Sequence, residues 1–117
     1  MKNMDDATIL SQGRRKAETL VENVQISSYI KAYSESFYIK AYSESLGGEQ
    51  TAARIRDLII RKYQAVYHAT WRNLEGGRPH ANVNDFLKDR GALSEAVMTA
   101  IFHTALNEAT VDYRYGA

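Results

Sequence analysis

The sequence predicts a single all-α domain of four or five helices spanning residues 1–117, and three observations support this. Pro79 is the only proline, so long helices can form without interruption. Apolar residues recur at intervals of three and four along most of the chain, as they do on one face of a helix. Glycines fall mainly between these periodic segments, where helices tend to end. We therefore expect a helical bundle.

The composition is that of an ordinary globular domain, with 44% hydrophobic and 25% charged residues. The chain has no cysteine, which excludes disulfides, thiolate metal sites and a cysteine nucleophile. No stretch approaches the roughly 20 apolar residues that a membrane helix needs, and the first residues lack the apolar run of a signal peptide. We expect a cytoplasmic protein without membrane contact.

The first helix is expected from about Asp6 to Gln25, with Asp5 or Asp6 as its N-cap. Six apolar side chains fall within an arc of about 120° on this helix: Ile9, Leu10, Ala17, Leu20, Val21 and Val24. Gly13 lies on the same arc, where it either allows a close helix approach or simply costs stability. After Val24 the apolar stripe moves to the opposite side, which predicts a kink, a helix end or a partner on the far face.

An octapeptide, Tyr-Ile-Lys-Ala-Tyr-Ser-Glu-Ser, occurs at residues 29–36 and again at 38–45. In a helix an offset of nine residues is about two and a half turns, so the second copy faces the opposite side. In a strand an odd offset also reverses the face.

Three interpretations of the repeat stay open. A long helix buried on both sides is favoured, because no glycine or proline lies between Arg14 and Leu46. A β-hairpin over residues 26–45 is the rival, because tyrosine and isoleucine favour strands. The third is a recent tandem duplication with one copy looped out or exchanged.

Three further helices are expected at about 49–74, 85–90 and 95–110, with Asn82 or Asn84 and then Ser94 as N-caps. The apolar arc of the first covers well over half of its circumference, which indicates a central helix or one shared with a partner. The last is apolar nearly all round, which indicates deep burial. The aromatic tail after it is expected to dock on the body or to form a short strand.

No catalytic constellation is evident, so we favour a non-enzymatic protein with no cofactor and no metal. His68, His80 and His103 do not stand at helical metal-ligand spacing from one another or from an acid. His103 is expected to be a hydrogen-bonded core residue. The glycine pairs lack the lysine and serine that would follow them in a phosphate-binding loop.

A basic strip on the helix at 49–74 is the clearest sign of a charged partner. Arg54, Arg61, His68 and Arg72 fall on one arc, and Arg78 extends it; cations at this spacing can follow a phosphate backbone. Asp57 lies on the same strip within reach of two of them. We therefore favour a solvated helix face and keep a nucleic-acid-binding regulator as an alternative.

Aromatic side chains are the strongest sign of self-association. The predicted oligomer interface is Tyr29, Tyr33, Phe37, Tyr38, Tyr42, Tyr67 and Trp71. The leading hypothesis is a helical interaction or regulatory protein that forms a homodimer or higher oligomer, with another protein partner also possible. A second alternative is a helical enzyme or ligand carrier with an inter-helix pocket near Tyr63, Trp71 and His103.

Overall fold

The structure is a computed structural model that describes residues 4–41, 48–79 and 81–116. Those ranges hold five helices and no strand, which confirms the helical bundle. The helices are α1 (Asp6–Val21), α2 (Val24–Ala41), α3 (Gly48–Glu75), α4 (Val83–Leu87) and α5 (Glu95–Tyr115).

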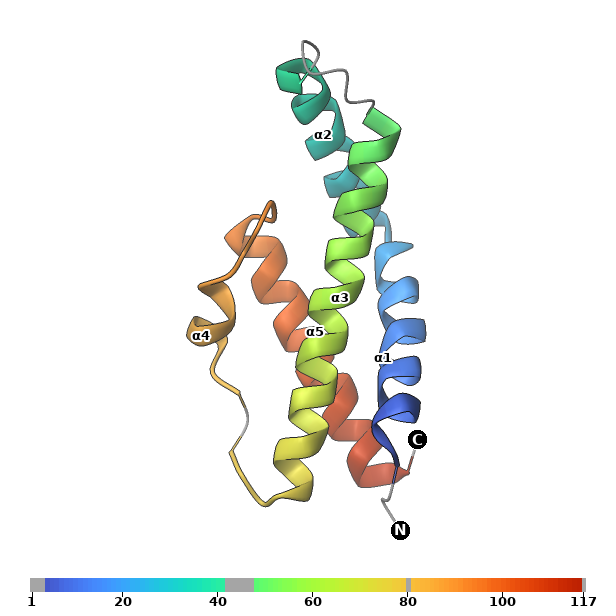
Figure 1. The fold of residues 1–117 in the computed structure, drawn as a ribbon, viewed down its shortest axis with the longest axis vertical. Coiled ribbons are helices and arrows are strands. Elements are labelled where there is room, and N and C mark those ends of the chain that lie inside the picture. The colour runs from blue at the N-terminus through green and yellow to red at the C-terminus, as the bar shows by residue number, and fades with distance from the viewer. Residues whose placement is uncertain (1–3, 42–47, 80, 117) are drawn as a thin grey trace.

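The longest helix, α3, runs along most of the molecule and contacts each of α1, α2 and α5 (Figure 1). The α1 and α5 helices pack on its C-terminal part, and α2 packs on its N-terminal part. The short α4 lies against α5. The molecule is elongated as a result, with extents of 53 × 25 × 22 Å.

Local hydrogen bonds explain where three of the helices begin. The side chains of Asp5, Asn82 and Ser94 accept backbone N–H groups in the first turns of α1, α4 and α5. These contacts satisfy donors that the helix itself leaves unpaired. All three residues were expected as caps from the sequence.

The first helix ends at Val21, and α2 begins three residues later. The backbone N–H of Gln25 donates to Asn23 Oδ1 at 2.9 Å, and the hydroxyl of Ser27 donates to the carbonyl of Val21 at 2.8 Å. The first bond pairs a backbone N–H in the first turn of α2. The second pairs the carbonyl at the end of α1, which has no partner within that helix. The apolar stripe changes sides because one helix ends here and another begins. This is one of the three outcomes that the sequence predicts.

The hairpin alternative for residues 26–45 is wrong over residues 26–41, which are helical in α2. The end of the second octapeptide lies outside the described residues. The serines that favour turns are accommodated in the helix: Ser34 is buried, and its hydroxyl donates to the carbonyl of Ile30 at 2.7 Å. Such a bond back to the preceding turn lets a serine lie within a helix.

Gly13 lets α1 lie close against the ring of Tyr67 on α3. A Cβ atom at this position would lie 3.1 Å from Cδ1 of Tyr67 and 3.3 Å from its Cγ. The glycine is buried, and its neighbours on the same face, Ile9 and Ala17, are fully buried. Of the two sequence interpretations of Gly13, close approach is therefore confirmed.

The wide apolar arc of α3 is covered within the chain by α1, α2 and α5. The largest fully buried side chains come mostly from α3 and α5: Trp71, Tyr63, Tyr67, Ile9, Ile59, Met98, Ile101 and Thr70. The width of this arc is explained by a central position and does not by itself require a partner.

The last helix differs from its prediction in two respects. Its surface is not buried all round, since Ala96 and Ala100 are exposed and Val111 is 51% exposed. It also continues to Tyr115, so the aromatic tail is helical and not a strand. Alanines are compatible with either a buried or an exposed helix face, and this is why their number overstated the burial.

Two regions follow from this arrangement. We call α1, α5 and residues 55–75 the body, where three helices pack together. We call residues 30–41 and 48–54 the arm, which extends beyond the start of α5 as two helices only (Figure 1).

Candidate functional site

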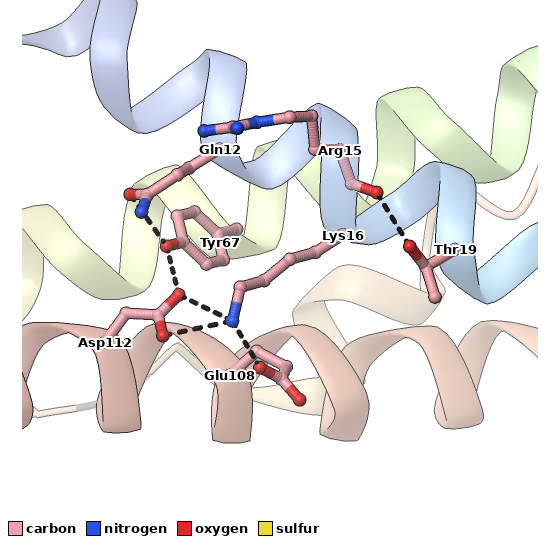
Figure 2. A network of polar contacts seen from close by, with 7 residues as sticks. All are labelled: Gln12, Arg15, Lys16, Thr19, Tyr67, Glu108 and Asp112. Atoms are coloured by element: carbon pink, nitrogen blue, oxygen red, sulfur yellow. Dashed lines mark hydrogen bonds and ion pairs between the residues drawn. The ribbon is translucent and has the colours of Figure 1, made fainter. Parts of the chain in front are cut away.

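A cluster of polar side chains lies where α1, α3 and α5 meet in the body (Figure 2). We call Lys16, Tyr67, Glu108 and Asp112 the Lys16 cluster. The ammonium of Lys16 donates to Glu108 Oε2 at 2.7 Å and lies 3.0 Å from both carboxylate oxygens of Asp112. The hydroxyl of Tyr67 donates to Asp112 Oδ2 at 2.5 Å. The cluster therefore joins three helices through one carboxylate.

Asp112 is the most buried charged group of the cluster, at 7% exposure. A buried carboxylate is costly unless charge and hydrogen bonds compensate it. Here a cation and a phenol supply both. The helical spacing of four residues puts Glu108 and Asp112 on the same face of α5, and this is why one lysine reaches both.

Lys16 and Tyr67 both have raised pKa values and stay protonated at neutral pH. Burial lowers the pKa of Lys16, but the hydrogen bonds that its ammonium donates to Glu108 and Asp112 outweigh this effect, so the pKa lies above the ordinary value of 10.5. Burial, reinforced by the bond to Asp112, raises the pKa of Tyr67. At neutral pH neither a free amine nor a phenolate is present at these two residues. The arrangement stabilises the helix crossing and offers no base or nucleophile from them.

The predicted basic strip is largely paired with acids. The guanidinium of Arg61 lies 3.1 Å from Asp57, as the sequence suggested. Arg72 forms ion pairs with Asp6 in the first turn of α1 and with Glu75. His68 Nε2 lies 3.4 Å from the same Asp6 carboxylate. Two of the four arginines of the strip therefore form ion pairs with acidic residues of the chain.

The other two residues of the strip lie apart from these pairs. Arg54 is exposed on the N-terminal part of α3. Arg78 follows α3, and its guanidinium donates to the carbonyl of Arg72 at 3.3 Å. The strip is thus divided between intramolecular contacts and an exposed position in the arm, and nucleic-acid binding stays a prediction.

The aromatic residues predicted for the oligomer interface separate into three groups. Tyr67 and Trp71 are buried at 0% and 1% exposure, so they belong to the core of the chain and not to its surface. Tyr29 and Tyr33 are half-buried on α2, with stacked rings 6.1 Å apart. The hydroxyl of Tyr29 accepts the backbone N–H of Ser94 at 2.9 Å. The side chains of Phe37, Tyr38 and Tyr42 lie outside the described part of the chain.

The pocket predicted near Tyr63, Trp71 and His103 is not assembled as expected. His103 is exposed on α5, with its ring edge-on to Phe102, so it is not a core histidine. Trp71 is in the core, where Tyr113 packs against it at 5.3 Å between ring centroids. Tyr63 lines a groove between α1 and α5, and neither of the other two residues is part of that lining.

Lys16, Glu108 and Asp112 are the residues that sequence reasoning missed. The contacts of Lys16 span 92 and 96 residues, so no local pattern reveals them. The one available signal was the pair of carboxylates four residues apart near the end of the chain.

Within the described residues, no group of three or more histidine, aspartate or glutamate side chains is arranged to hold a metal ion. None of the helices in that part of the chain is long and apolar enough to cross a membrane. No protein-family model, curated protein or solved structure matches this chain.

Proposed function

We propose that this protein is a non-enzymatic interaction protein that assembles with a second copy of itself through the arm. The observation that carries the proposal is the continuity of α2 from the first octapeptide into the start of the second. Because α2 is one helix to Ala41, position 39 lies half a turn around the helix from position 30. The isoleucine of each octapeptide copy, at positions 30 and 39, therefore falls on an opposite face of one helix.

The first copy has its partner inside the chain. Ile30 is 4% exposed and belongs to the apolar core that α2 shares with α3. By helical register, position 39 of the second copy lies on the side away from that packing. The α2 helix packs on α3 and meets α1 only near their junction, so no other helix of the described chain lies along that side.

Few of the described side chains in the arm are both apolar and fully buried. Of its described side chains, the buried ones are Ile30, Ser34 and Thr51, and two of these three are polar. Isolated helices are marginally stable in water, and tertiary packing of apolar faces provides most of their stability. Contact with a second copy would add the missing apolar burial.

A second copy is the simplest occupant. A two-fold interface uses the same patch on both subunits, so one apolar face is complementary to itself. The arm carries few charges over the repeat, one lysine and one glutamate in each octapeptide, and therefore presents no strong field that would select a highly charged partner.

The test is the solution mass across a range of micromolar concentrations, measured by light scattering and by sedimentation. The wild-type protein should be a dimer that dissociates on dilution, and Ile39→Ala should shift the equilibrium to monomer. Lys31→Ala is the matched control, because Lys31 is exposed on the same helix; it should leave the mass unchanged. A wild-type monomer at every concentration would refute the proposal, as would an Ile39→Ala variant that dimerises normally.

A further inference from the structure

A groove between α1 and α5 lies beside the Lys16 cluster, in the body and away from the arm. It has a volume of about 290 Å³ and is open to solvent. Its lining is more apolar than polar and consists of Lys16, Thr19, Leu20, Asn23, Tyr63, Thr104 and Glu108. The two helices contact each other only sparsely, and this leaves the space between them.

Tyr63 is the unusual member of this lining. It is 1% exposed, yet no described residue forms a hydrogen bond with its hydroxyl. Tyr67, one turn further along α3, has the partner expected of a buried phenol, Asp112. Buried polar groups almost always have a partner. The Tyr63 hydroxyl is not one of the buried atoms without a partner, so it opens into the groove, where it can bond to a ligand atom.

The charge at this end of the groove is not balanced. Glu108 and Asp112 supply two negative charges, and Lys16 supplies one positive charge. Lys16 contacts both oxygens of Asp112 but only Oε2 of Glu108, so Oε1 of Glu108 is available to another donor. A second cation at Glu108 would make the cluster neutral. Partial burial makes such a pairing stronger than it is in bulk water.

We propose that this groove binds a small organic primary ammonium ion with an apolar body. An ammonium group has three N–H donors, and three residues of the lining carry an oxygen that can accept one: Glu108, Tyr63 and Thr104. The apolar body of the ligand lies against Leu20. Burial, together with the nearby charges of Glu108 and Asp112, raises the pKa of Tyr63, so its hydroxyl stays neutral and accepts an N–H.

The first test is a titration of the wild-type protein with phenethylammonium chloride, followed by ¹H–¹⁵N NMR. Saturable shifts should appear at the amides of Leu20, Tyr63, Thr104 and Glu108. The neutral isostere 2-phenylethanol and the anion 3-phenylpropanoate should bind at least about tenfold more weakly, because each lacks the charge-assisted bond. No saturable shift, or an equal response to the alcohol, would overturn the proposal.

Variants locate the site. Glu108→Gln keeps the shape of the side chain and should weaken binding by about tenfold or more. Glu95→Gln is the matched control, an exposed glutamate on the same helix, and should bind as the wild type does. Tyr63→Phe removes a hydroxyl that bonds to none of the described residues, so the variant should fold normally and bind several-fold more weakly. Wild-type affinity in either Glu108→Gln or Tyr63→Phe would overturn the assignment. The dimer test above is independent of this result, since the groove lies in the body.

Discussion

The body and the arm share one helix, α3, but they are stabilised differently. In the body, α3 packs between α1 and α5, and aromatic side chains such as Tyr63, Tyr67 and Trp71 are almost completely buried. In the arm, α3 packs on α2 alone, and the buried positions include Ser34 and Thr51. The difference shows that one continuous helix can be a core element among three helices at one end and half of a two-helix pair at the other.

Substitutions of buried residues should have the largest effect on the free energy of unfolding. The loss should be larger in the body than in the arm. Trp71→Ala should lower the free energy of unfolding by about 3–5 kcal/mol, because it leaves a large cavity among three helices. Ile30→Ala in the arm should cost about 2 kcal/mol, at the low end for such a change, because a two-helix site collapses more easily. Urea denaturation of both variants at one protein concentration measures this difference. An arm variant that loses as much as Trp71→Ala would contradict the comparison.

The two neighbouring tyrosines of the body should respond differently to removal of the hydroxyl. Tyr67→Phe should cost about 1–2 kcal/mol at neutral pH, because Asp112 loses one of its two compensating partners. Tyr63→Phe should change stability by less than about 0.5 kcal/mol, since its hydroxyl bonds to nothing in the described fold. Thermal and urea unfolding give both values, and equal losses would argue against the assigned hydrogen bonds.

Gly13→Ala should destabilise the body by about 1 kcal/mol. The added methyl gains helix propensity of about 1 kcal/mol. It also meets the ring of Tyr67, which Asp112 holds in place, and overpacking of this kind costs about 1–3 kcal/mol. The double variant Gly13→Ala/Tyr67→Phe, whose ring is no longer tethered, should lose less than the sum of the two single changes. Strict additivity in a double-mutant cycle would show that the contact is not the cause.

The free energy of unfolding should fall at alkaline pH and should not depend on these three groups near neutral pH. The folded pKa values of Lys16, Tyr63 and Tyr67 are all raised above their ordinary values of 10.5, 10.0 and 10.0. A raised folded pKa contributes stability that is fully present below the unfolded pKa, and this contribution falls as pH rises above it. The free energy of unfolding should therefore decline above about pH 10. Tyr63→Phe should reduce the slope of that decline, and a flat profile up to pH 12 in the wild type would contradict the shifts.

The local features of the fold could be predicted from the sequence. The predicted helix at 49–74 corresponds to α3, Gly48–Glu75, because its apolar period is regular and glycines flank it. The caps Asp5, Asn82 and Ser94 are local too, since each acts on a backbone group a few residues away. Such features need no knowledge of tertiary contacts.

Contacts between residues far apart in the sequence could not be predicted in the same way. The sequence could not place Lys16 against Glu108 and Asp112, because their contact depends on how α1 and α5 cross α3. It also could not separate the aromatic residues of the core from those of the surface: Tyr67 and Tyr33 look alike as sequence, but only Tyr67 lies among three helices. The prediction that His103 is a core residue was wrong for the same reason. Apolar neighbours in the sequence do not determine the direction in which its side chain points.

Amide hydrogen exchange at two protein concentrations tests most directly whether the arm is completed by a second copy. Amides of residues 30–41 and 48–54 should exchange more slowly at high micromolar concentration than after dilution, because dimerisation stabilises the state that buries them. Amides at the centre of the body, around Tyr67 and Ile101, should exchange at the same rate in both samples. Exchange in the arm that does not depend on concentration, or protection that grows only in the body, would contradict the assignment of self-association to the arm.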